Sequence, residues 1–472
     1  MITFTLCLVA LIAGYFIYGS FVERVFGPDD RKTPALTKAD GVDFIPLPTW
    51  KIFMIQFLNI AGLGPIFGAI MGAKFGSASY IWIVLGSIFA GATHDYLAGM
   101  LSLRNGGMSL PEIIGKYLGT TTKQVMRCFT AIFMMLVGAV FVAGPAGLLG
   151  ALTPDSLDVT FWIIIIFVYY ILATMLPIDK VIGKIYPLFA IALIFMAVGI
   201  LVMLYVKQPE LPEIWEGLQN THPLAESLPI FPIMFVSIAC GAMSGFHATQ
   251  SPLMARCMTS EYHGKPVFYG AMITEGVVAL IWAAAATYYF HENGMQENNA
   301  SVIVNSITSD WLGVAGGLLA ILGVIAAPIS SGDTALRSAR LIIADFLKLD
   351  QKNIKRRLYI SIPMFVITLA LLLYSLKDAE GFNLIWRYFA WSNQTLAVFT
   401  LWAITVFLAY AKKPYIITLI PALFMSVICV TYICVAPEGL GLTQQVSYIV
   451  GAISVVFATA LFFFWKNKID KK

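Results

Sequence analysis

Charged residues are scarce in this sequence of 472 residues. Asp, Glu, Lys and Arg make up 12% of the chain, whereas 59% of the residues are hydrophobic. An average soluble domain carries roughly 25% charged residues, so a chain of this length could not cover a water-facing surface with so few. The shortage excludes a soluble enzyme, a coiled coil and a disordered chain. The net charge of +4 is too small to indicate a nucleic-acid partner.

Motifs for metal binding, disulfide bonding and ATP hydrolysis are also missing. The six cysteines lie scattered through apolar runs without a CxxC or CxxH pattern, and the five histidines are equally dispersed. No GxxxxGK[ST] sequence occurs. We therefore predict neither an enzyme nor a bound cofactor, with Na+ as the one ion considered below.

Long apolar runs are abundant instead. A spanning helix needs about 20 mostly apolar residues, and thirteen runs have about this length. They are continuously apolar rather than alternating, which predicts helices and not barrel strands. The predicted spans are 2–22, 52–73, 80–101, 128–150, 160–177, 187–206, 229–252, 267–290, 311–330, 358–376, 385–411, 414–435 and 446–465.

Positive charges between these runs predict the orientation of the chain in the membrane. With the N-terminus outside and the C-terminus inside, 26 Lys and Arg residues fall in cytoplasmic segments and four fall outside. Cytoplasmic loops of membrane proteins carry such an excess. The basic stretch 332–348 is then cytoplasmic, and we predict a separate amphipathic helix there, facing water and lipid headgroups.

Two predicted spans carry glycine and proline where a helix should be continuous. They contain NIAGLGP at 59–65 and GAMSGFHATQSP at 241–252. Gly costs about 1 kcal/mol and Pro about 3 kcal/mol inside a helix, and unwound backbone survives in a membrane only where it lines a protein cavity. A simple kink, or close packing of helices at glycine, would also explain either segment alone.

The spacing of the two breaks predicts an inverted repeat. Five spans begin with each break, and because five is odd the second set starts on the opposite side of the membrane. This arrangement is typical of secondary transporters whose binding site lies at the breaks. We predict an all-α polytopic membrane protein with about thirteen transmembrane helices and a 5+5 inverted repeat. Its units are an N-terminal helix and loop (1–50), two repeats (51–206 and 229–411) and two C-terminal helices (412–472).

The substrate site is predicted at the breaks, at the facing span 128–150, and at an arginine near the outer end of span 385–411. Half-helix N-termini, or this arginine, would bind a carboxylate. The predicted substrate-binding residues are Gly62, Gly64, Phe141, Gly144, Gly245, Phe246, His247 and Arg387.

Ionisable residues inside a membrane are candidates for coupling. Glu275 lies near the middle of span 267–290. Asp95 lies towards the inner end of its span, where an ion pair with a cytoplasmic Arg or Lys would explain it equally well. His247, beside the second break, is as readily a hydrogen-bonded structural residue as a substrate ligand.

Five stretches resemble the carbon starvation protein A family of bacterial peptide and pyruvate transporters. They are QFLNIAGLGPIFGAIMGAKFG (56–76), GATHDYLAGMLSLRNGGMSLPEIIG (91–115), GFHATQSPLMARCMTSE (245–261), APISSGDTALRSARLIIAD (327–345) and RYFAWSNQTLA (387–397). The resemblance implies import of small peptides or pyruvate during carbon starvation, coupled to H+ or Na+. Many members are longer at the C-terminus, so their substrates need not be those of this short form.

The broken helices are also similar to those of the amino acid–polyamine–organocation superfamily. Its Asn-x-x-Gly-Leu-Gly stretch reads Asn59–Gly64 here, and its Ala-x-x-Thr/Ser-Ser cation motif reads Ala327–Ser331. The resemblance implies a Na+ site without a carboxylate. The expected oxygens come from the carbonyl groups of Leu58, Ala61 and Ala327 and the hydroxyl groups of Ser330 and Ser331. If the ion is a proton, Glu275 or Asp95 must carry it.

Several alternatives stay open. Ser330 and Ser331 would merely cap the following segment if Gly332 turned the chain. A channel, or a nutrient sensor that binds without transporting, is the competing function. Expected partners are a small-molecule substrate and the lipid bilayer. The sequence decides neither between peptide and pyruvate, nor between H+ and Na+, nor the oligomeric state.

Overall fold

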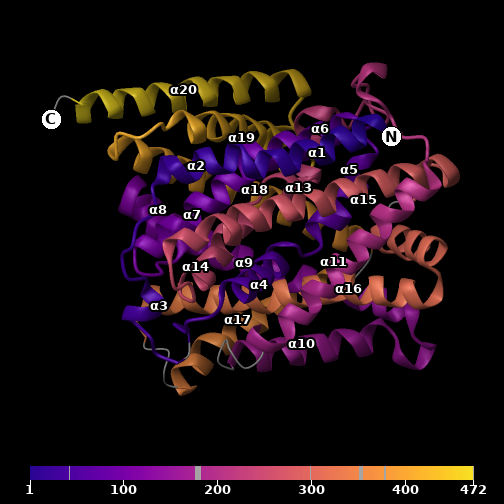
Figure 1. Cartoon of the computed structure of the whole chain (residues 1–472), viewed down its shortest axis with the longest axis horizontal. Coiled ribbons are helices and arrows are strands. Elements are labelled where there is room, and N and C mark those ends of the chain that lie inside the picture. The colour runs from indigo at the N-terminus through magenta and orange to yellow at the C-terminus, as the bar shows by residue number, and fades with distance from the viewer. Residues whose placement is uncertain (42, 176–181, 298, 350–353, 377–378, 471–472) are drawn as a thin grey trace.

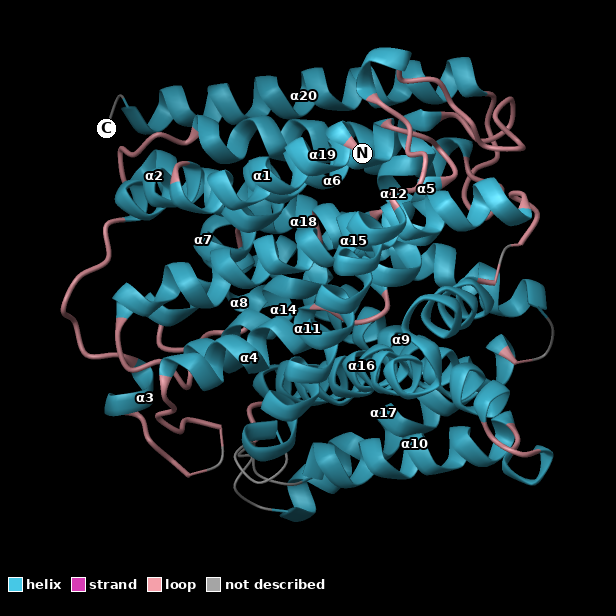
Figure 2. Cartoon of the chain, turned by 45° about the vertical axis from the view of Figure 1, so that its right-hand side comes forward, coloured by secondary structure: helices cyan, strands magenta, loops and turns pink. Residues whose placement is uncertain are grey.

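The computed structural model describes residues 1–472 except 42, 176–181, 298, 350–353, 377–378 and 471–472, and every regular element of the described part is a helix (Figure 2). The α-helices are α1 (Ile2–Phe16), α2 (Tyr18–Phe26), α3 (Pro34–Thr37), α4 (Thr49–Ile60), α5 (Ala69–Ala73), α6 (Ala78–Leu85), α7 (Ala92–Arg104), α8 (Leu110–Leu118), α9 (Thr120–Leu152), α10 (Val159–Met175), α11 (Ile182–Lys207), α12 (Phe235–Ser237), α13 (Ala239–Ala242), α14 (Gly245–Ala255), α15 (Ala271–Asn293), α16 (Ala300–Leu347), α17 (Ile354–Ser375), α18 (Ala379–Tyr410), α19 (Ile416–Val435) and α20 (Gln444–Asp470). Short π-helical turns are η1 (Gly64–Gly68), η2 (Gly86–Gly91), η5 (Ile230–Met234) and η7 (Lys265–Gly270), and 3-10 turns are η3 (Asp155–Leu157), η4 (Ile214–Glu216) and η6 (Glu261–His263).

Nine stretches of the described chain are long and apolar enough to cross a membrane, or ten if the bent pair Thr49–Ile60 and Gly64–Ala73 is one span. The sequence predicted thirteen, and three of the predicted spans are not among these ten. Helix α10 is short, with 17 residues. Predicted span 229–252 is divided among four short helices. Predicted span 311–330 lies inside α16, where the side chains of 314–321 are outside the described residues.

The helices form a bundle whose edges are exposed and apolar. Helices α19 and α20 form one edge and α10 and α17 the opposite one, with α4, α9 and α14 between them (Figure 1). In the most apolar part of Glu261–Asn293, which contains α15, 89% of the residues are buried, against 17% in α20. The centre is therefore enclosed by protein, while the peripheral helices offer their apolar sides to lipid.

The predicted separate, headgroup-facing helix at 332–348 was wrong. Helix α16 bends at Gly313 but continues through both serines to Leu347, so no turn occurs at Gly332. Arg337 and Arg340 are fully buried. The Arg337 Nη2 donates to the Ala173 carbonyl oxygen at 2.7 Å, and its Nη1 lies 3.8 Å from the Asp43 Oδ1. The charge of Arg337 faces the protein interior, where it has a carbonyl and a carboxylate partner.

Candidate substrate and ion site

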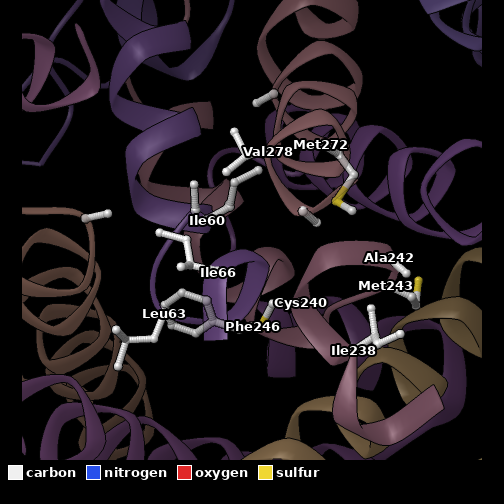
Figure 3. Close-up of a cluster of buried hydrophobic side chains, with 14 of the residues drawn as sticks. Ile60, Leu63, Ile66, Ile238, Cys240, Ala242, Met243, Phe246, Met272 and Val278 are labelled. Atoms are coloured by element: carbon white, nitrogen blue, oxygen red, sulfur yellow. The ribbon is translucent and has the colours of Figure 1, made fainter. Parts of the chain in front are cut away.

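The two broken helices meet inside the bundle, where Ile60 and Leu63 lie beside Cys240 and Phe246 (Figure 3). Helix α4 ends at Ile60, and the chain resumes as η1 after a bend of 54°. A Cβ atom on Gly64 would lie only 2.1 Å from the Cβ of Cys240. Glycine is therefore required for the close approach of the two breaks, which is a packing role for Gly64.

The second break is held open by side chains of α18. Met243 and Ser244 are extended between α13 and α14. The Asn393 Oδ1 accepts hydrogen bonds from the Phe246 N–H at 2.7 Å and the Ser244 hydroxyl at 3.0 Å, and the Gln394 Nε2 donates to the Met243 carbonyl oxygen at 3.0 Å. The N-terminus of α14 is therefore capped by a side chain, so the Phe246 N–H is already engaged.

Several predicted substrate-site residues lie close together and are buried. A Cβ on Gly62 would lie 2.8 Å from the Phe141 ring, and one on Gly144 would lie 2.5 Å from Leu63. The Phe141 and Phe246 rings are 6.1 Å apart and nearly perpendicular. These residues form an apolar wall at the first break. Gly245 instead packs against the backbone of α18, where a Cβ atom on it would lie 2.4 Å from the Asn393 carbonyl oxygen.

Arg387 lies apart from this group. Its side chain is 41% exposed, and its Nε is 3.3 Å from the Glu438 Oε2. The guanidinium is therefore directed to the segment after α19 rather than to the breaks, and the geometry gives no support to its predicted contact with substrate.

Three ionisable residues that were predicted separately form one cluster. The His247 Nδ1 lies 2.7 Å from the Asp95 Oδ2, and the His247 Nε2 lies 3.2 Å from the Glu275 Oε2. The His94 Nδ1 lies 2.8 Å from the Asp95 Oδ1. All four side chains are fully buried. The imidazole of the broken helix is thus held between carboxylates of α7 and α15. The partners of Asp95 are histidines, and not the cytoplasmic Arg or Lys of the alternative explanation.

Ser331 joins the first break to α16. Its Oγ lies 3.2 Å from the Leu58 carbonyl oxygen, 2.9 Å from that of Asn59 and 3.0 Å from that of Ala327. The Ser330 Oγ donates to the Ala327 carbonyl oxygen at 2.7 Å. Four of the five predicted cation ligands therefore gather here. The Asn59 carbonyl, rather than that of Ala61, is the further oxygen bonded to Ser331.

Two polar residues of α4 were missing from the predicted site. Gln56 and Asn59 are fully buried, and all four of their side-chain amide atoms have no hydrogen-bond partner among the described residues. Buried amides are normally bonded, so these groups are suited to bind a polar ligand or water. Asn59 opens the glycine-rich motif, and Gln56 lies one turn earlier, which is the signal that the sequence offered.

The model of the family described as carbon starvation protein CstA matches residues 1–150, 151–313 and 293–432. The chain belongs to this family. It is an all-helical, multi-pass membrane protein of a bacterial family of secondary transporters, and not an enzyme.

The alignments with curated relatives cover different fractions of this chain and of each relative. An uncharacterised membrane protein of Haemophilus influenzae is 43% identical over 342 residues, 62% of this chain and 92% of its own. Peptide transporter CstA of Bacillus subtilis is 27% identical over 90% of this chain and 88% of its own. The pyruvate/proton symporter BtsT of Escherichia coli is 27% identical over 58% of this chain but only 47% of its own.

Solved structures agree on the fold. The manganese transporter of Eremococcus coleocola superposes with a TM-score of 0.60 over 91% of this chain and 98% of its own, at 13% identity. A Na+-coupled sialic acid symporter gives 0.57 over 95% and 96%, at 14% identity. The chain therefore shares the overall fold of these transporters.

Proposed function

We propose that the protein imports a small carboxylate, either pyruvate or a short peptide, together with protons. The observation that carries this proposal is His247, which lies on a broken helix and contacts Asp95 and Glu275 at once. Buried ionisable groups in a membrane protein mark proton and ion pathways. Among the relatives, one is named a pyruvate/proton symporter and another a peptide transporter.

The cluster links a proton to the position of α14. When His247 is protonated, its positive charge lies between the two carboxylates and offsets one of them. When it is neutral, both ionised carboxylates face each other without a cation, and unpaired buried charges repel strongly in a medium of low dielectric constant. Loss of the proton therefore favours movement of α14 away from α7 and α15. The extended residues Met243 and Ser244 provide the hinge.

The substrate site lies at the first break in this proposal. The amide groups of Gln56 and Asn59 can donate to a carboxylate, which pyruvate and the C-terminus of a peptide share. Phe141 and Phe246 bury the apolar part of the substrate, and Gly62 lets the Phe141 ring pack closely against the first break. Binding at the junction of the two broken helices would couple their movements.

The topology belongs to the same proposal. We place the protein in the bacterial cytoplasmic membrane with thirteen spans, a 5+5 inverted repeat, the N-terminus outside and the C-terminus inside. The split of 26 against four Lys and Arg residues supports this orientation. The proposal also includes a role during carbon starvation, which is supported only by the family to which the chain belongs.

Sodium is the second candidate for the coupling ion, and Ser331 favours it. A hydroxyl group has one proton, yet three carbonyl oxygens lie within 3.2 Å of the Ser331 Oγ. Carbonyl oxygens released by helix unwinding are the usual Na+ ligands of such transporters.

Uptake into proteoliposomes tests the proposal. Labelled pyruvate and labelled dipeptides are offered separately, with a pH gradient, a Na+ gradient or neither. Concentrative uptake of one substrate driven by the pH gradient supports proton coupling. Uptake driven only by the Na+ gradient supports Na+ coupling through the oxygens at Ser331 instead. Rapid equilibration that no gradient can drive uphill indicates a channel, and binding without entry indicates a sensor.

A further inference from the structure

Asp333 is a fully buried carboxylate that neither the substrate site nor the histidine cluster uses. It lies on α16 two residues after Ser331. Its Oδ2 accepts hydrogen bonds from the phenol groups of Tyr186 and Tyr169, the latter at 3.2 Å. Its Oδ1 has no hydrogen-bond partner among the described residues. A buried carboxylate oxygen without a donor is costly, so this atom is suited to a ligand.

The surroundings of Asp333 are rich in oxygen. The Tyr186 hydroxyl lies 3.1 Å from the Ser330 carbonyl oxygen as well as against Asp333. It has one proton for these two acceptors. Tyr169 belongs to α10 and Tyr186 to α11, and both helices pack against α16. Three helices thus bring a carboxylate, two phenol oxygens and a backbone carbonyl to one place.

The nearest basic residue along α16 is engaged elsewhere. Arg337 follows Asp333 by one turn, but its Nη2 donates to the Ala173 carbonyl oxygen and its Nη1 lies 3.8 Å from Asp43. The charge of Arg337 is therefore shared with the segment before α4. The Oδ1 of Asp333 accepts no hydrogen bond from the described residues, so it can take another cation as its partner.

We propose that Asp333, Tyr169, Tyr186 and the Ser330 carbonyl group form a binding site for a monovalent metal cation, with Na+ as its ligand. Hard cations prefer oxygen ligands, with carboxylates foremost. The site adjoins the Ser331 oxygen cluster through Ser330. The Ser330 Oγ belongs to the Ser331 cluster, and the Ser330 backbone carbonyl belongs to the proposed site. A cation that leaves the neutral oxygens at Ser331 would find its first carboxylate at Asp333, towards the C-terminal end of α16.

The role of this site in transport rests on the proposed function, but cation binding itself does not. Purified full-length protein is heated in detergent at constant pH and ionic strength, with NaCl replacing choline chloride. We expect Na+ to raise the thermal midpoint of the wild type in a saturable manner, because a ligand that binds only the folded state stabilises it. Asp333→Asn should abolish this rise. Asp310→Asn, on the exposed part of the same helix, should keep it.

Tyr186→Phe provides a second test in which the carboxylate stays in place. It should raise the Na+ concentration for half-maximal stabilisation by about tenfold, which corresponds to about 1.4 kcal/mol. The inference fails if Na+ does not stabilise the wild type, or if Asp333→Asn or Tyr186→Phe responds to Na+ as the wild type does. Should Asp333→Asn not fold, the Tyr186→Phe result decides. Proton-driven uptake by a protein that ignores Na+ would contradict this site and leave the proposed function intact.

Discussion

Replacing Glu275 by Gln should separate the movement of substrate from its coupling to protons. The change keeps the size of the side chain and removes one of the two carboxylates that contact His247, at a distance of 3.2 Å. In the variant, a protonated His247 keeps only Asp95 as a close negative partner, at 2.7 Å. The free-energy difference between the proton-bound and proton-free states of the cluster then changes. The substrate wall at Phe141 and Phe246 is left untouched.

The size of the effect follows from the energy stored in the gradient. A pH difference of one unit is worth about 1.4 kcal/mol for each proton, so one coupled proton supports about tenfold accumulation at equilibrium. We expect about tenfold accumulation by the wild type and close to no accumulation by Glu275→Gln. Exchange of external labelled substrate for internal unlabelled substrate requires no net proton movement, so the variant should keep it.

Both activities are measured in the same proteoliposomes, with Glu292→Gln as the matched control. Glu292 lies at the far end of α15, and its side chain is 53% exposed. This control should accumulate substrate like the wild type. Undiminished accumulation by Glu275→Gln would refute the role of the cluster in coupling, and loss of exchange together with accumulation would indicate a structural role instead.

Three further predictions test the rest of the site. Asn59→Ala should weaken substrate binding by about 1.5–3 kcal/mol, the value of a hydrogen bond to a charged group. It should not lower the thermal midpoint, because the Asn59 amide has no hydrogen-bond partner among the described residues to lose. An unchanged KM would contradict this prediction. Asn393→Ala removes the cap of the Phe246 N–H and should cost about 1–3 kcal/mol, seen as a lower thermal midpoint; a midpoint equal to the wild type would oppose it. Ser331→Ala should raise the Na+ concentration for half-maximal uptake only if Na+ is the coupling ion; an unchanged Na+ response leaves proton coupling as the sole candidate.

The sequence predicted the breaks well because their signal is local. Glycine and proline disfavour a continuous helix whatever its surroundings, and in the structure the helices end at Ile60 and at Ala242. The oxygens of Ala327, Ser330 and Ser331 were predicted from a short match to a fold family, and the Leu58 carbonyl from the unwinding expected before Gly62. The shift from Ala61 to Asn59 depends on the backbone angles of the break, which residue types do not specify.

Contacts between distant segments escaped prediction. Asp95 and His247 are 152 residues apart in sequence, and nothing local indicates that they touch. Asp333, Arg337 and Arg340 were assigned to a water-facing helix because charge usually means exposure. Tyr186 and the Ala173 carbonyl group supply buried partners for Asp333 and Arg337 from other helices. Arg387 was predicted as a carboxylate ligand from its place near the outer end of span 385–411, and its ion pair with Glu438 depends on the fold of the segment after α19.

Proton movement caused by substrate tests the central claim most directly. Proteoliposomes containing the wild-type protein are loaded with a pH-sensitive dye, with equal pH and equal Na+ on both sides. Pyruvate or a dipeptide is then added outside. Proton-coupled import predicts that the lumen acidifies as the substrate enters, and that vesicles without protein show no change beyond passive leak. Entry of labelled substrate through the protein at a constant internal pH would contradict the account.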